Sequence, residues 1–226
     1  MANLAFGPEK AKTYEGGIRA VLFDNRVRAN LTGFYNDVTG KQLTVFLPEF
    51  NVGAVQNVGE AYTAGAEFET EARLAPGLDF SGNVGYLKAK ITDWPNAFGC
   101  PANCTDGDDV DLVYAPKWTA NARLSYEAPI GGDFVAGMSG EVQYQGRAYT
   151  RTPNGTVLDL TRTSEPGTYL NASAWLKPNE NWTLKALVRN IADEDYQIYN
   201  FGIPGISDGI SYTIPRTVLV TLSYSY

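Results

Sequence analysis

The sequence predicts an all-β fold, an antiparallel transmembrane β-barrel segment with short turns at one end of its strands and long loops at the other. Three observations favour this fold class. Apolar and polar residues alternate with a period of two, the connections alternate in length, and aromatic residues gather near the ends of the alternating segments. No segment shows a helical period, and none approaches about 18 uninterrupted apolar residues, so a membrane-spanning helix is excluded.

Nine segments show this alternation, and each is predicted to be one strand. Because successive side chains of a strand point to opposite faces, the alternation gives each strand one apolar and one polar face. The clearest example runs from Trp118 to Tyr126, with Lys117 directly before it and with Thr119 and Arg123 among the polar residues between the apolar ones. The apolar set occupies odd positions in 27–35 and even positions in 14–22, 62–71, 78–86, 118–126, 134–145, 170–176, 182–188 and 218–226.

The connections between these segments are alternately short and long. Short ones fall at 24–25, 75–77, 129–133 and 178–181, and long ones fall at roughly 40–55, 95–115, 149–166 and 195–213. Bacterial outer-membrane barrels have short periplasmic turns on one rim and longer extracellular loops on the other. Soluble β-sandwiches mix their loop lengths and use Greek-key crossings, so the loop pattern favours the barrel.

The apolar face is rich in Ala and Gly in the middle of the strands and carries aromatic residues at their ends. The opposite face carries Arg, Glu, Asn and Gln, as a water-filled lumen requires. Trp118 and Tyr126 are separated by eight residues, and Phe134 and Tyr144 by ten. At roughly 3.3 Å per residue and a tilt near 40°, the two rows of aromatic residues lie about 20–25 Å apart, which fits an apolar band about 25 Å tall.

Composition narrows the function. The net charge of −7 argues against a nucleic-acid-binding surface, which needs clustered Lys and Arg. The chain has no histidine, so His-dependent nucleophilic catalysis and His-ligated zinc are excluded, and we expect no enzyme, metal centre or cofactor. Cys100 and Cys104 are candidates for a local disulfide, which requires an oxidising compartment. Residues 1–10 lack the features of a signal peptide, and we therefore expect further chain upstream.

Four stretches carry a resemblance to a known family. The first is Pro8-Glu9-Lys10, followed by Tyr14-Glu15-x-Gly17 and then Phe34-Tyr35. The second is Asn57-x-Gly59 with Gly65-Ala66-Glu67-Phe68-Glu69 after it, the third is Asn190-Ile191-x-Asp193-x-x-Tyr196, and the fourth is Pro215-Arg216 before an aromatic-ended last strand. In this order and spacing they resemble the C-terminal part of the β-barrel of TonB-dependent receptors, the active importers of the Gram-negative outer membrane.

The resemblance implies that residues 1–226 form about nine strands of a 22-stranded barrel, with the plug domain and signal peptide absent from this stretch. It implies location in the outer membrane, contact with its lipid, and uptake of a scarce bulky solute such as a siderophore, vitamin or glycan. TonB would energise uptake through the plug region, and the barrel-assembly machinery would read the last strand, which ends at Tyr226. The alternatives are a small outer-membrane barrel with an anchoring role and a secreted soluble β-sandwich that acts as a binding module.

Two sets of residues are candidates for the functional site. The first is predicted to line the lumen and comprises Glu67, Glu69, Arg123, Glu141, Gln143 and Arg147. The alternation places Glu67, Glu69 and Glu71 on one strand face, where we expect ion pairs with basic residues such as Arg73 and Lys88 rather than a metal or acid–base array. The second set is predicted to capture ligand from the loops and comprises Trp94, Phe98, Tyr149, Arg151, Tyr199 and Phe201.

The loop residues also have interpretations that involve no ligand. Tyr199 and Phe201 could simply pack the loop 198–206 against its neighbours. The four aspartates at 106, 108, 109 and 111 offer the oxygen ligands that Ca²⁺ prefers, but their spacing is not that of an EF-hand, and an acidic solvated loop is the favoured interpretation.

Overall fold

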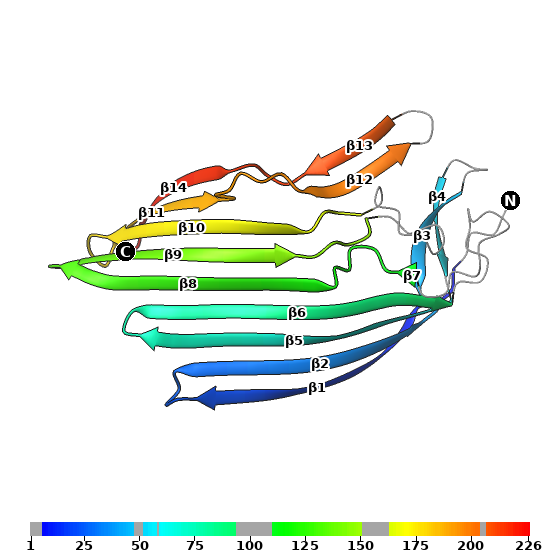
Figure 1. The fold of residues 1–226 in the computed structure, drawn as a ribbon, viewed down its shortest axis with the longest axis horizontal. Helices are drawn as coiled ribbons and strands as arrows, with labels where there is room; N and C mark the ends of the chain where they lie inside the picture. Colours follow the sequence, from blue (N-terminus) through cyan, green and yellow to red (C-terminus); the bar gives the residue numbers. More distant parts are fainter. Residues whose placement is uncertain (1–5, 48–51, 58, 94–109, 151–162, 204–206) are drawn as a thin grey trace.

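Nine long antiparallel strands form the main sheet of the computed structural model (Figure 1), which describes residues 6–47, 52–57, 59–93, 110–150, 163–203 and 207–226. Their spatial order is β1-β2-β5-β6-β8-β9-β10-β11-β14. The bounds are β1 Lys10–Leu22, β2 Val27–Thr39, β5 Glu60–Ala75, β6 Leu78–Asp93, β8 Trp118–Gly131, β9 Phe134–Gln145, β10 Gly167–Lys177, β11 Trp182–Arg189 and β14 Thr217–Tyr224. The nine predicted strands are therefore confirmed, and each observed strand overlaps one predicted segment, although several strands extend beyond it.

Five shorter strands lie in the long connections. β3 (Gln42–Leu47) pairs with β4 (Val52–Asn57), β12 (Gln197–Ile203) pairs with β13 (Ser207–Tyr212), and β7 (Val110–Asp111) pairs with β6. Treating 40–55 and 195–213 as loops without strands was therefore wrong. Both hairpins contain six- or seven-residue strands rich in Val, Ile, Phe and Tyr, residue types that favour strands.

The short turns all lie at one end of the sheet, as predicted. Phe23, Asp24 and Asn25 have φ angles of 54°, 53° and 66° in the turn between β1 and β2. Asp and Asn tolerate this left-handed conformation better than most residues, and two of the three positions are occupied by them. The turn residues of the sequence thus determine where the first hairpin reverses.

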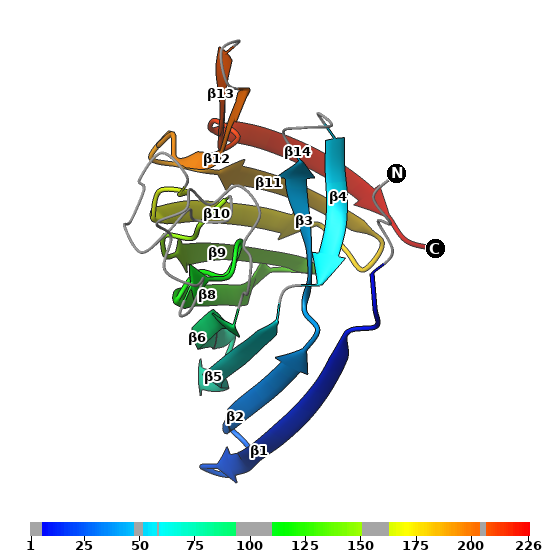
Figure 2. The same cartoon turned by 90° about the vertical axis from the view of Figure 1, so that its right-hand side faces the viewer.

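The main sheet is a single curved layer, which Figure 2 shows end-on as an arc from β1 to β14. Within the described residues β1 pairs only with β2, and β14 pairs only with β11, so the arc is not closed. The chain exposes 15006 Å² of surface, whereas a compact protein of its mass exposes about 10,000 Å². The structure therefore contradicts the alternative of a β-sandwich, in which two sheets cover one another.

The hairpin β3–β4 lies across the concave side of the arc, at the end with the long loops (Figures 1 and 2). A small buried cluster of Ala61, Ile91 and Val110 lies at this end, and Leu43 of β3 packs against it. Neighbours in the register place Val38, Ala61, Ile91 and Val110 in one row on the concave face. This cluster holds the hairpin over the concave surface. Among the described residues there is no helix with the length and apolar character needed to cross a membrane.

Candidate functional site

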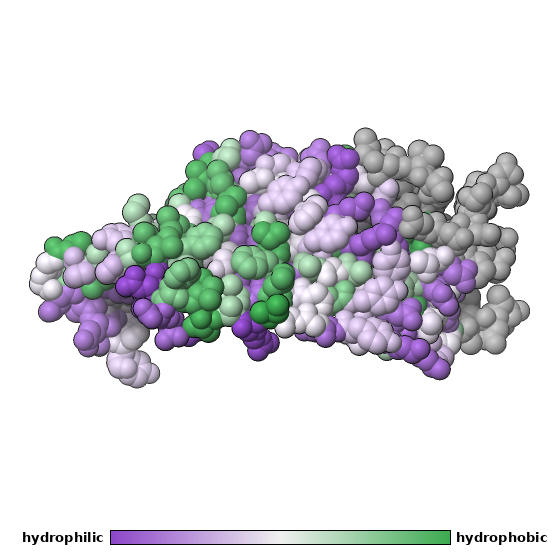
Figure 3. All heavy atoms as spheres, turned by 60° about the horizontal axis from the view of Figure 1, so that its bottom comes forward, coloured by the Kyte–Doolittle hydropathy of each residue, from purple (hydrophilic) through white to green (hydrophobic). Residues whose placement is uncertain are grey.

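The convex face carries the apolar residues, and most of them are exposed. Ile18 is 70% exposed and Val218 65%, and Leu31, Val84, Leu124 and Leu222 are also exposed. Figure 3 shows apolar residues gathered in a patch on the part of the surface that it presents, with paler residues beside the patch. Monomeric soluble proteins rarely expose an apolar surface that extends over so many strands. The convex face is thus suited to lipid, as the alternation predicted.

The concave face is polar, and the register arranges its residues in rows. One row crosses six strands and contains Asn30, Glu69, Asn83, Asn121 and Gln143, ending at Tyr169. The next row toward the short turns contains Arg28, Glu71, Ser81, Arg123, Glu141 and Asn171. Because these rows run at right angles to the strands, amide and charged groups lie side by side across the main sheet, which we call the wall.

Five of the six residues predicted to line the lumen therefore lie on the concave face: Glu67, Glu69, Arg123, Glu141 and Gln143. Arg147 follows the end of β9 and is exposed. The sequence analysis did not single out Tyr169 and Asn171, which lie in the same rows. Tyr169 and Asn171 occupy odd positions that alternate with the apolar residues at the even positions of 170–176. The pattern that identified the other residues could therefore have identified these two as well.

Hydrogen bonds join neighbouring side chains of the concave face. Asn121 Nδ2 donates to Glu141 Oε1 at 2.7 Å, and Gln143 donates to the same oxygen. Asn30 Nδ2 donates to Glu69 Oε2 at 3.4 Å. Glu141 is thus held by amides from two strands rather than by a cation.

The expected ion pairs of the β5 carboxylates with Arg73 and Lys88 were wrong. Arg73 Nε lies 3.2 Å from Asp79 Oδ1, because the register places Arg73 opposite Asp79 on β6. Lys88 pairs in register with Ala64 and therefore lies on the convex face, opposite to Glu67, where its Nζ lies 5.5 Å from the centre of the Tyr62 ring.

Several hollows open on the concave face, and two of them lie at different distances from the short turns. One of about 780 Å³ lies near the short turns and is lined by residues that include Arg28, Glu71, Arg73, Asp79 and Arg123. The other, of about 620 Å³, lies closer to the long loops. Its lining includes Arg123, Glu141, Gln143, Tyr169, Asn171, Lys185 and Arg189. Both hollows offer charges of both signs and amide groups, which suit hydrogen bonding to a polar solute. No group of three or more Cys, Asp or Glu side chains that could hold a metal ion occurs in the described part of the chain.

Three tyrosines lie at the end with the long loops. The Tyr114 N–H donates to the Tyr149 carbonyl at 2.7 Å, and an isolated parallel bridge joins Val113 to Tyr149. Burial raises the pKa of the Tyr114 phenol, and the neighbouring Tyr199 phenol raises it further. The structure therefore brings Tyr149 and Tyr199, both predicted to be loop residues of the site, close to Tyr114, which the sequence analysis had not selected. The sequence signal that could have identified Tyr114 is its position as an aromatic residue two places before Pro116.

The other predicted loop residues are less informative. Trp94, Phe98, Arg151, Cys100 and Cys104 lie outside the described residues, as do the aspartates at 106, 108 and 109. Phe201 belongs to β12. Asp111 Oδ1 lies 3.2 Å from Lys90 Nζ, so this carboxylate of the acidic segment is paired with a lysine. A ligand-capturing role for these residues stays a prediction.

Comparisons with known proteins agree with this geometry. The family model "TonB dependent receptor-like, beta-barrel" matches residues 2–191. The metal-pseudopaline receptor CntO of Pseudomonas aeruginosa strain UCBPP-PA14 is 26% identical over 227 residues, which cover 100% of this chain and 29% of CntO. The chain thus spans about three-tenths of the curated relatives it matches.

Solved structures of similar architecture cover nearly the whole chain. The ferric yersiniabactin uptake receptor FyuA from Yersinia pestis matches with a TM-score of 0.75 and 20% identity over 98% of this chain and 30% of FyuA. The siderophore receptor PiuA from Acinetobacter baumannii matches with a TM-score of 0.72 and 20% identity over 98% of this chain and 29% of PiuA. At this identity the likeness establishes the fold.

Proposed function

We propose that this chain, which belongs to the TonB-dependent receptor β-barrel family, forms part of the wall of an outer-membrane receptor that takes up a bulky solute. The family consists of transport receptors of the Gram-negative outer membrane rather than enzymes. The observation that carries the proposal is the division of one sheet into an exposed apolar convex face and a polar concave face with hollows. Such a sheet separates lipid from an aqueous interior.

The solute that we propose is a metal–chelate complex. CntO is a metal-pseudopaline receptor, and the structural neighbours include receptors for ferric yersiniabactin and other siderophores. Tyr114, Tyr149 and Tyr199 at the long-loop end of the sheet would supply aromatic surface for such a complex. The amide-rich rows of the concave face would supply hydrogen-bond donors. A vitamin or a glycan is the competing solute class.

The partners are proposed on the same basis. The unpaired edges of β1 and β14 would each pair with another strand of a closed barrel, because an open sheet edge is not tolerated in hydrocarbon. TonB would supply energy through a plug domain, and the barrel-assembly machinery would recognise the strand β14 and its aromatic end at Tyr226. Lipid would cover the convex face.

The proposal is tested by deleting the gene in its source organism and measuring cellular metals under metal limitation. The cells receive their own spent medium, which contains their chelators, loaded with iron, zinc, nickel, cobalt or copper in separate cultures. We expect the mutant to accumulate less of at least one metal, and we expect deletion of TonB to abolish the difference between mutant and wild type. Unchanged contents of all five metals would contradict the metal–chelate proposal. Uptake of a labelled vitamin or glycan that depends on the gene would favour the competing class.

A further inference from the structure

The two hairpins that leave the wall, β3–β4 and β12–β13, are anchored at their bases by the same arrangement of hydrogen bonds. Asn57 ends β4, and its side-chain amide contacts two other segments. Its Oδ1 accepts the Gly7 N–H at 2.5 Å, while its Nδ2 donates to the Gly7 carbonyl at 3.1 Å and to the Gly40 carbonyl at 2.7 Å. Three chain segments meet at this one side chain.

Asn190 follows the end of β11 and repeats this pattern at the other hairpin. Its Oδ1 accepts the Glu194 N–H at 3.1 Å, and its Nδ2 donates to the Glu194 carbonyl at 2.9 Å and to the Ile214 carbonyl at 3.3 Å. Each asparagine thus binds both the N–H and the carbonyl of one residue, and then a carbonyl of a third segment.

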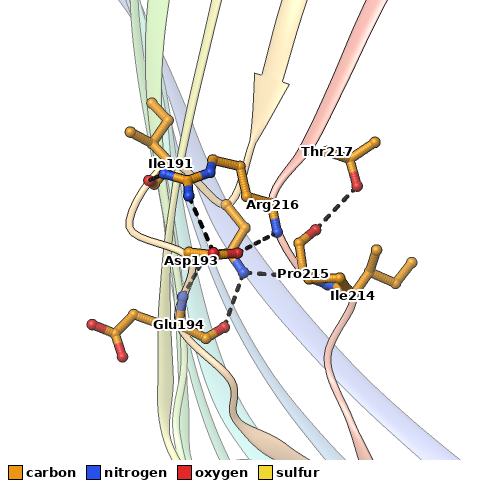
Figure 4. A network of polar contacts seen from close by, with 8 residues as sticks. Ile191, Asp193, Glu194, Ile214, Pro215, Arg216 and Thr217 are labelled. Atoms are coloured by element: carbon orange, nitrogen blue, oxygen red, sulfur yellow. Dashed lines mark hydrogen bonds and ion pairs between the residues drawn. The ribbon is translucent and has the colours of Figure 1, made fainter.

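A carboxylate completes each arrangement. Glu9 Oε2 accepts the Gln42 N–H at 2.8 Å and lies 3.1 Å from Lys41 Nζ. Asp193 Oδ1 accepts the Arg216 N–H at 2.8 Å, and its Oδ2 accepts a guanidinium hydrogen bond from the same Arg216 at 3.2 Å (Figure 4). In both cases one carboxylate accepts a hydrogen bond from a backbone N–H and also pairs with a basic side chain. The basic residue is Lys41, the neighbour of Gln42, in the first group and Arg216 itself in the second.

We call the first group, Gly7, Glu9, Gly40, Lys41, Gln42 and Asn57, the Asn57 clamp. The second, Asn190, Asp193, Glu194, Ile214 and Arg216, is the Asn190 clamp. The two differ in burial, because Asn190 is 4% exposed whereas Asn57 is exposed. Removing one partner of a buried hydrogen bond costs more than removing an exposed one, so the Asn190 clamp should contribute more.

We propose that the two clamps hold β3–β4 and β12–β13 as preset arms at the loop end of the wall. An arm that is already ordered loses less conformational entropy when a solute binds. Leu43, packed on the buried cluster of Ala61, Ile91 and Val110, adds a second anchor for β3–β4 alone. The effect on solute binding rests on the proposed function, whereas the anchoring of the hairpins does not.

Hydrogen exchange of the receptor purified from outer membranes tests the anchoring, because local opening exposes backbone amides. Asn190 has a φ of 51°, which glycine adopts without strain, so Asn190→Gly removes the amide and little else. We expect exchange in β12 and β13 to become about ten- to hundredfold faster, with β3 and β4 unchanged. Asn57→Ala should accelerate exchange in β3 and β4 by a smaller factor and leave β12 and β13 unchanged.

Asn83→Ala is the matched control, because Asn83 is an exposed asparagine in the middle of β6, and within the described residues β6 pairs with neither hairpin. It should leave both hairpins as in the wild type. Unchanged exchange of β12 and β13 in Asn190→Gly would overturn the proposal, and so would an equal rise across all strands of the wall. Should Asn190→Gly not assemble, Asp193→Asn provides the same readout with the backbone and the amide of Asn190 intact.

Metal uptake from spent medium is measured on Asn190→Gly and Asn57→Ala. Faster hairpin exchange together with weaker uptake at low solute concentration, restored at high concentration, is the result that the full proposal predicts. Faster exchange with wild-type uptake would refute the contribution to solute binding and leave the anchoring intact. Absence of uptake by the wild-type receptor would contradict the proposed function, while the exchange data would still decide on the clamps.

Discussion

Single residues of this wall have roles that a substitution can isolate, and Gly137 is one example. A Cβ atom at Gly137 would overlap the Trp175 indole, which lies across the backbone at this point and donates a hydrogen bond from Nε1 to Glu127. Lys177 Nζ lies 2.7 Å from the same carboxylate. We expect Gly137→Ala to displace Trp175 and to destabilise the folded wall by about 1–3 kcal/mol, as overpacked sites do.

The midpoint of heat-induced unfolding, read from the electrophoretic mobility of unboiled receptor, checks this expectation. Gly140→Ala is a suitable control, because no atom lies within 4 Å of a Cβ placed there. Equal midpoints for the two variants would show that the contact between Gly137 and Trp175 is not constrained.

Glu9 makes the Asn57 clamp sensitive to acid. The hydrogen bond from the Gln42 N–H, assisted by the charge of Lys41, holds the pKa of Glu9 below its ordinary value of 4.5. A carboxyl whose pKa is lowered on folding stabilises the structure above its unfolded pKa, and this contribution is lost as the pH falls through the lowered value. The clamp is therefore intact at neutral pH and weakens below pH 4.5.

We expect exchange of β3 and β4, corrected for the intrinsic rate, to accelerate as the pH falls from 5 to about 3. Glu9→Gln should give fast exchange over the whole range, with no such step. A wild-type profile without a step, or a step that persists in Glu9→Gln, would show that another group is responsible.

At the scale of elements, alternation and turn chemistry were sufficient to predict all nine wall strands and their turns. The hairpins β3–β4 and β12–β13 were not predicted, because their segments were assigned to loops on length alone. Residues in them that favour strands include Leu43, Val45, Ile198 and Tyr199. Glu9, Asn57, Asn190, Asp193 and Arg216 were singled out only as parts of the four stretches that carry the family resemblance, and the contacts that join them into clamps were not predicted. Asn57 contacts Gly7 across 50 residues, and Asn190 contacts Ile214 across 24, so both depend on how separate segments meet.

The two faces of a strand should respond oppositely to a charge. Val84 of β6 lies on the convex face and Asn83, its neighbour, lies on the concave face, and both are exposed. We expect Val84→Arg to cost about 2–4 kcal/mol, because it places a cation in hydrocarbon, and Asn83→Arg to be tolerated. The amount of folded receptor in outer-membrane fractions measures the difference, and equal amounts for the two variants would contradict the assignment of the faces.

At the scale of the whole molecule, the described strands form a curved layer that covers neither of its faces with a second sheet. The exposed area of 15006 Å² and the apolar convex face imply that residues 1–226 require lipid or detergent. We expect this stretch, expressed alone without detergent, to sediment with membranes or aggregates. A monodisperse soluble monomer in light scattering would favour a soluble binding module instead.

The division of the wall into a lipid-facing and a water-facing side is the central claim, and a spin-label scan of β6 tests it most directly. Single cysteines at 78–86, in a receptor whose Cys100 and Cys104 are replaced by serine, are labelled in outer membranes. Access to oxygen, which dissolves in lipid, and to a polar nickel complex is then measured at each site. We predict oxygen maxima at 78, 80, 82, 84 and 86, with relatively greater access of the nickel complex at the positions between them. Access that does not alternate, or that alternates in the opposite phase, would contradict the account.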